Sequence, residues 1–149
     1  MANIDQEVKT KFTNNKHRFL TNLVFTANWF NNMFVEFLKP YGISPQQFNI
    51  LRILRGANDW VSMNDIKALM VDKSPNATRL SDKLLEKELV ERKRSEQDRR
   101  VVYLALSKKG EELLEAIDKS DNSRHMEVED RITEEEAKQF SDILDKIRG

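Results

Sequence analysis

The chain has 149 residues, carries 25 Lys and Arg against 25 Asp and Glu, and contains no cysteine. One domain of this size can bury a core without disulfides, and the absence of cysteine excludes thiol nucleophiles and thiolate metal sites. No apolar run is long enough for a membrane helix, and the first residues lack a signal-peptide core. A cytoplasmic protein with no membrane partner is therefore expected.

The balanced charge hides an asymmetry along the chain. Residues 1–110 hold 19 Lys and Arg and 12 Asp and Glu, whereas residues 111–149 hold 6 and 13. The basic part can attract phosphate, and the acidic part then has to lie away from it. Alternatively, the acidic excess of residues 111–149 belongs to a solvated helix with no role in binding.

The first predicted element is one long helix over residues 4–38. Its apolar side chains recur at steps of three and four residues, and Pro40 and Gly42 end it. Seven of the eight phenylalanines fall between Phe12 and Phe48. A helix this apolar needs more partner surface than a small domain offers, which indicates a subunit interface.

Capping signals predict the later helices. Ser44-Pro45-Gln46-Gln47 combines an N-cap serine with proline at the first helical position and glutamine at the third. Short helices are expected from Ser62 and from Ser74-Pro75, and a further helix after Ser107 has no clear end between 120 and 131. A capping box at Thr133 begins the last helix.

A charged hairpin is predicted between Leu89 and Ser107. Its two flanks have strand composition, its middle has turn composition, and Arg92 to Arg100 includes five basic and two acidic residues. Val61 can add a short third strand. Two short helices followed by such a hairpin form a winged helix-turn-helix, so the predicted fold class is mainly α with a small β-hairpin (α+β).

Residues 98–110, with the sequence DRRVVYLALSKKG, resemble the wing of the MarR family of bacterial transcription regulators. The family pattern is Asp-x-Arg, a strand, and then Leu-Thr/Ser-x-x-Gly. Arg79-Leu80 and Leu89-Val90-Glu91-Arg92 are similar to the family's recognition helix and its exit. Glu88 stands where the family usually has glycine, which implies either a strained residue or a different helix exit. The absence of cysteine excludes the family's thiol-based peroxide sensors.

The resemblance implies a single domain over residues 1–149. A winged helix-turn-helix at about 44–106 would be flanked by dimerisation helices at about 4–39 and 107–148. The implied function is that of a homodimeric, sequence-specific DNA-binding regulator of a pseudo-palindromic operator. A repressor relieved by a small aromatic or phenolic effector is expected, with no enzyme activity and no cofactor.

The wing supplies the first candidate DNA contacts. By the resemblance, Arg100 enters the minor groove, whose narrow A·T-rich form attracts arginine. Asp98 would orient Arg100 through a charge-assisted hydrogen bond, and Arg99 would contact phosphate. The alternatives are solvated turn arginines and an aspartate that caps its own turn. Arg92, Lys93 and Arg94 alternate along a strand, so only some of them can face DNA, and Arg94 is the candidate.

The helix expected from Ser74-Pro75 is the one that would read the DNA bases, and we call it the reader helix. Its first turns supply the other candidate DNA contacts. N-terminal side chains of such a helix reach base edges, and its amides favour phosphate. The candidates are Ser74, Asn76, Thr78 and Arg79, with Lys83 as a weaker phosphate contact. Ser74 can also be a pure N-cap.

Two further groups of residues have side chains that can bind ligands. The family resemblance implies that Trp29, Phe30, Phe34 and Phe37 line an effector pocket, although ordinary packing explains an aromatic stripe equally well. His17 and His125 have no suitably spaced partner, so no metal site is expected.

Two other functions compete with DNA binding. A winged-helix module that binds a protein would show no steep salt dependence for DNA. An enzyme would need a phosphate loop or a nucleophile setting, and neither motif is present in the sequence.

Overall fold

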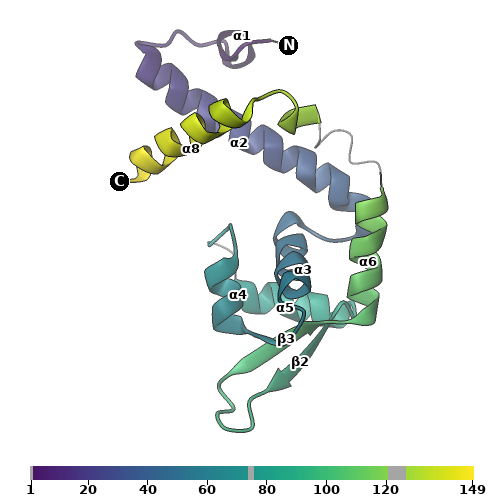
Figure 1. The fold of residues 1–149 in the computed structure, drawn as a ribbon. Helices are drawn as coiled ribbons and strands as arrows, with labels where there is room; N and C mark the ends of the chain where they lie inside the picture. Colours follow the sequence, from purple (N-terminus) through teal and green to yellow (C-terminus); the bar gives the residue numbers. More distant parts are fainter. Residues whose placement is uncertain (1, 74–75, 121–126) are drawn as a thin grey trace. The chain divides into compact units, whose positions relative to one another are not determined.

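A computed structural model describes residues 2–73, 76–120 and 127–149. The chain divides into two compact units, Met1–Leu113 and Leu114–Gly149. Figure 1 labels the helices and strands along the chain. No helix in the described ranges is long and apolar enough to cross a lipid bilayer.

The prediction of one helix over residues 4–38 is wrong, because two helices occupy this range. They are α1 (Ile4–Val8) and α2 (Asn15–Leu38). Lys9 ends α1 in the left-handed region with φ 52°, and Asn14 begins α2 by accepting a hydrogen bond from the His17 amide at 2.9 Å. A polar residue that caps a new helix start competes here with continuation of the first helix.

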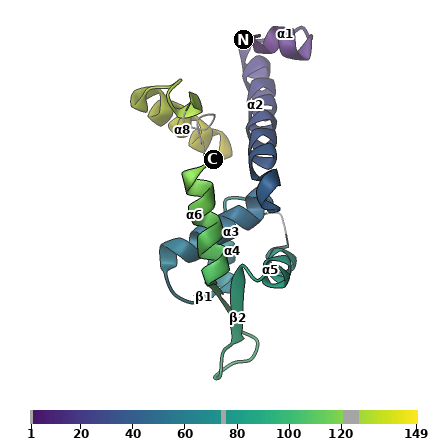
Figure 2. The ribbon, with the colours of Figure 1, turned by 90° about the vertical axis from the view of Figure 1, so that its right-hand side faces the viewer.

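The short helix α1 is tied to α2 by an ion pair. The Arg18 guanidinium donates to both carboxylate oxygens of Asp5 at 3.0–3.1 Å. This hydrogen bonding lowers the pKa of Asp5 below its ordinary value. Figure 2 shows α1 lying across the N-terminal end of the long α2.

Helix α2 leads through a short 3-10 helix, η1 (Lys39–Tyr41), into α3 (Pro45–Ala57). Gly42 has φ 69° at the turn between them. The predicted capping box is confirmed, because the Ser44 hydroxyl accepts from the Gln47 amide and the Gln47 side chain accepts from the Ser44 amide.

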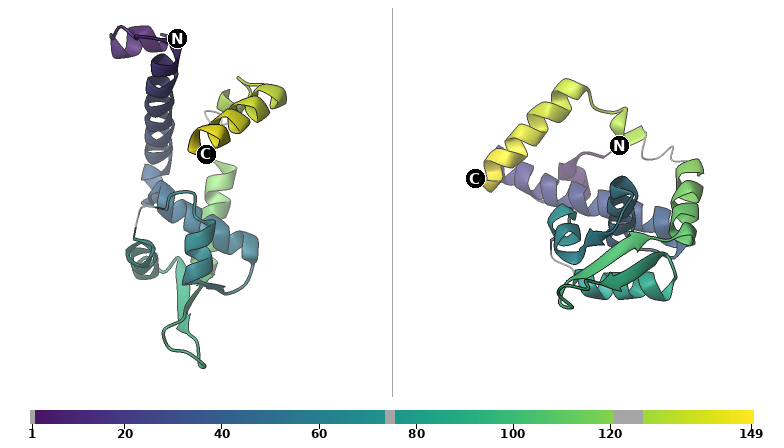
Figure 3. Two further views of the ribbon diagram at one scale, coloured as in Figure 1. Left: turned by 90° about the vertical axis from the view of Figure 1, so that its left-hand side faces the viewer. Right: turned by 60° about the horizontal axis from the view of Figure 1, so that its bottom comes forward.

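The winged helix-turn-helix begins with α3 and contains a three-stranded antiparallel sheet of order β1-β3-β2. Its elements after α3 are β1 (Val61–Ser62), α4 (Met63–Leu69), α5 (Ala77–Glu86), β2 (Val90–Arg94) and β3 (Val102–Leu106). Val61 pairs with Leu104, so the short third strand is confirmed. Figure 3 shows the β2–β3 hairpin projecting past the helices of this unit.

The reader helix α5 starts two residues later than predicted. Asn76, not Ser74, is its N-cap, and its side chain accepts from the Arg79 amide at 3.2 Å. Asn and Ser cap about equally well, so the sequence offered two starts of similar strength. Ser74 and Pro75 lie outside the described residues.

Helix α5 ends in a Schellman motif that contains no glycine. The amides of Glu88 and Leu89 donate to the carbonyls of Leu85 and Leu84 at 2.9 and 3.0 Å. Glu88 takes the left-handed position with φ 60°. The helix exit is therefore the one that a glycine would make, and Glu88 is a strained residue within it.

The core of the first unit lies where α3, α4 and α5 pack together and against β3. Its side chains are less than 2 % exposed, and they include Leu38, Ile50, Leu51, Leu54, Ile66, Leu84 and Leu104. Because these residues come from five different elements, the core fixes the reader helix relative to the base of the wing.

The second unit contains the end of α6 (Lys108–Lys119) and all of α8 (Glu134–Arg148). The predicted capping box is confirmed, because the Thr133 hydroxyl accepts from the Glu136 amide and the Glu136 carboxylate accepts from the Thr133 amide. Hydrogen bonds that the Thr133 amide and hydroxyl donate to the carboxylate lower the pKa of Glu136.

Candidate nucleic-acid interface

The first turns of α5 present polar side chains to solvent. Thr78, Arg79 and Lys83 are exposed, whereas Ala77 and Leu84 are buried. Asn76 is exposed but uses its carbonyl oxygen as the cap, so its amide group alone is left to donate to a base. Of the candidates on this helix, only Ser74 lies outside the described residues.

Asp98 holds the tip of the wing together in two ways. Its Oδ1 accepts from the Arg100 amide at 3.0 Å, which closes the turn, and from Arg100 Nε at 3.2 Å. The Arg100 side chain is nevertheless 91 % exposed. The two roles proposed for Asp98 occur together, and Arg100 is both oriented and accessible.

The alternation of side chains along β2 separates its three cations. Arg92 donates to Asp82 Oδ1 on α5 at 2.7 Å, and Arg94 donates to the carbonyl oxygen of Arg99 at 3.0 Å. Lys93 is on the opposite face, with its ammonium 4.4 Å from the ring centre of Trp60. Arg92 and Arg94 therefore face the reader helix, and Lys93 faces away from it.

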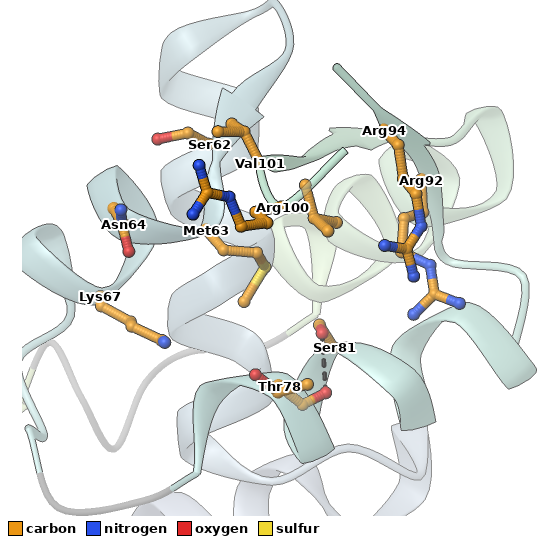
Figure 4. Close-up of a pocket in the computed structure, with 11 residues that line it drawn as sticks. Ser62, Met63, Asn64, Lys67, Thr78, Ser81, Arg92, Arg94, Arg100 and Val101 are labelled. Atoms are coloured by element: carbon orange, nitrogen blue, oxygen red, sulfur yellow. Dashed lines mark hydrogen bonds between the residues drawn. The ribbon is translucent and has the colours of Figure 1, made fainter. Parts of the chain in front are cut away.

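A cleft of about 270 Å³ lies between α4, α5 and the wing. Figure 4 shows Lys67 reaching in from α4, with Arg92 and Arg94 on the opposite side. None of the described residues that line the cleft is acidic. Its polar lining comprises Ser62, Asn64, Lys67, Thr78, Ser81, Arg92, Arg94 and Arg100.

Sequence reasoning missed Asn64 and Lys67 as members of this surface. They lie three residues apart on α4, which places them on the same side of a helix. The spacing of these two residues is visible in the sequence, but their position beside α5 and the wing comes from tertiary packing.

Three aromatic rings, two from α2 and one from α3, surround Phe34. Its ring centre lies 5.9 Å from that of Phe30, 6.4 Å from that of Phe37 and 6.0 Å from that of Phe48 on α3. Trp29 and Phe30 are 42 % and 39 % exposed. Packing therefore accounts for Phe34 and Phe37, while Trp29 and Phe30 present accessible aromatic surface.

Comparison with known proteins finds a family that is similar to this part of the chain. A model of the MarR family matches residues 43–102, the range from the start of α3 to the beginning of β3. A mutant MarR from Escherichia coli, solved in complex with operator DNA, superposes with a TM-score of 0.72 at 26 % identity, over 92 % of this chain and 99 % of that one. The winged region of this chain is therefore similar to that of the MarR family.

Two curated MarR-type regulators are similar in sequence. The transcriptional repressor MprA of Escherichia coli (strain K12) is 31 % identical over 83 residues, which are 55 % of this chain and 47 % of MprA. The match therefore spans about half the length of that relative. The regulator MhqR of Bacillus subtilis (strain 168) is 28 % identical over 117 residues, which are 78 % of this chain and 80 % of MhqR.

Proposed function

We propose that this protein is a MarR-type, sequence-specific DNA-binding transcription regulator. The observation that carries the proposal is the shared placement of the α5 side chains, the acid-free cleft and the exposed Arg100 on one compact unit. Phosphate contacts supply affinity, α5 supplies base readout, and Arg100 reads the minor groove. The MarR structure with operator DNA supports the same assignment. Such a protein acts in the cytoplasm, where its DNA is, and the proposal includes no enzyme activity and no cofactor.

The regulator works as a homodimer on a pseudo-palindromic operator. Large apolar side chains at helical spacing are exposed on α2 and on α8, and contiguous apolar surface of this kind marks subunit interfaces. They include Leu20, Val24, Phe25, Trp29, Phe30, Val35, Phe140, Ile143 and Ile147. A two-fold dimer presents two reader helices, so its operator has matching half-sites.

Repression relieved by a small aromatic effector completes the proposal. MprA is a named repressor, which supports the sign of regulation. The accessible ring of Phe30 adjoins Phe34, which contacts Phe48 of the winged region. An effector bound at Trp29, Phe30, Phe34 and Phe37 can therefore favour one dimer conformation over another.

The test is selection of bound sequences from a pool of random duplex DNA, followed by titration of the enriched site from about 50 to 200 mM salt. A two-fold-symmetric site with steep salt dependence is expected. No enriched site, with weak and uniform binding, would overturn the proposal in favour of a winged-helix module that binds protein.

A further inference from the structure

We propose that the cleft between α4, α5 and the wing holds a phosphate of the DNA backbone, bound by Lys67, Arg92 and Arg94. This phosphate seat rests on the proposed function and adds to it a binding site with named residues. Two of the three, Lys67 and Arg92, were not candidates from the sequence.

The path of the DNA backbone explains why a phosphate would lie in this cleft. With the reader helix in the major groove and the wing in the adjacent minor groove, the backbone strand between those grooves passes between the two elements. In this protein the cleft occupies that position, between α5 and the wing. The residues that line the cleft would therefore contact phosphate groups and not base edges.

The lining has the chemistry that a phosphodiester needs. Lys67 enters from α4 and the two arginines enter from β2, on opposite sides of the same space (Figure 4). A guanidinium can grip phosphate with two parallel hydrogen bonds, and an ammonium adds a point charge. None of the described lining residues is acidic, and the carboxylate that touches the seat, Asp82, is already paired with Arg92.

Both arginines are held in place before any DNA arrives. Arg92 is anchored by Asp82 at 2.7 Å, and Arg94 by the carbonyl oxygen of Arg99 at 3.0 Å. Each guanidinium still has further N–H groups to donate. Prior anchoring reduces the side-chain entropy lost on binding, so the seat is partly formed in the free protein.

The neighbouring Lys93 provides a matched control within the same strand. It carries the same charge as its neighbours, but its ammonium lies over the Trp60 ring on the other face of β2. The register pairs it with Tyr103, while Arg92 pairs with Leu104. Its removal should therefore change no phosphate contact.

The experiment measures the slope of log K against log salt for Lys67→Gln, Arg92→Gln and Lys93→Gln, on the selected operator and on random-sequence duplex. Each lost phosphate contact should reduce the magnitude of the slope by about 0.9. The affinity lost between 50 and 200 mM salt should then be roughly threefold smaller than for the wild type. Lys67→Gln and Arg92→Gln should each show this reduction on both DNAs with the preferred sequence unchanged. Lys93→Gln should keep the wild-type slope.

Three controls separate the possible failures. Thermal melting checks each fold, and Arg92→Lys should retain the wild-type slope because it keeps the charge. Unchanged slopes for Lys67→Gln and Arg92→Gln would overturn the seat, and so would an altered base preference. If the wild type selects no operator while these variants still lower the slope on random duplex, the regulator proposal fails and the seat stands.

Discussion

Gly110, in the first turn of α6, lies so close to the backbone of Leu89 that a β-carbon at position 110 would overlap the Leu89 carbonyl oxygen. The same β-carbon would come within 2.8 Å of Leu106 Cδ1. This contact joins the start of α6 to the exit of the reader helix, and it explains the glycine of the Leu-Ser-x-x-Gly motif.

Gly110→Ala should therefore destabilise the protein by about 1–3 kcal/mol, the usual range for forcing extra atoms into a packed site. Chemical denaturation measures the change in the free energy of unfolding. Gly56→Ala is the matched control, because a β-carbon at Gly56 meets nothing within 4 Å. That change in α3 should stabilise the protein by about 0.5–1 kcal/mol, and a similar gain for Gly110→Ala would contradict the close contact.

Glu88→Gly should stabilise the protein by about 1 kcal/mol, because glycine adopts the left-handed conformation without the penalty that Glu88 bears at φ 60°. Glu88→Ala separates backbone strain from side-chain effects, since it keeps the β-carbon. It removes only an exposed pair with Lys109 at 3.7 Å, which contributes little. An equal gain from both variants in denaturation experiments would argue against strain.

Arg100→Ala should weaken binding to sites with A·T-rich flanks by about 1–3 kcal/mol while leaving the fold and oligomeric state intact. Sites with G·C-rich flanks should lose less, because their minor groove attracts arginine less. Asp98→Asn is the milder companion, since an amide oxygen can still close the turn to the Arg100 amide. Titration of A·T-flanked and G·C-flanked sites with each variant measures the loss of affinity. Equal losses of affinity for the two kinds of site would contradict minor-groove reading.

The capping box of α8 should make the N-terminal turn of that helix depend on pH. Hydrogen bonds from the Thr133 amide and hydroxyl lower the pKa of Glu136 below its ordinary value of 4.5. The stabilising effect is therefore fully present above that value and is lost as the pH falls through the lowered pKa. Amide exchange of residues 134–137 between pH 6 and 3 tests this expectation. Glu136→Gln should show no such titration, and an identical pH dependence in that variant would exclude the capping box as its cause.

Much of the fold follows from local signals that the tertiary structure does not override. The Ser44 and Thr133 capping boxes, the charged hairpin and the short strand at Val61 all have a residue pattern with one physical interpretation. Elsewhere the sequence offers two choices of similar energy. Asn76 competes with Ser74 as a cap, and Asn14 starts a new helix inside an otherwise continuous apolar pattern.

The sequence by itself determined the resemblance to the MarR family, the order of the elements and the identity of the wing residues Asp98 and Arg100. These depend on periodicity, on capping chemistry and on residues close together in the chain. Only the tertiary structure decided that Lys67 of α4 shares a cleft with Arg92 and Arg94, and that Lys93 is directed to Trp60 instead. The register of β2 on β3 and the packing of α4 against α5 set those neighbours, and both come from contacts between residues far apart in the sequence. Likewise, Glu88 occupies a glycine position because the Schellman hydrogen bonds and the packing of Leu89 outweigh the local backbone preference of one residue.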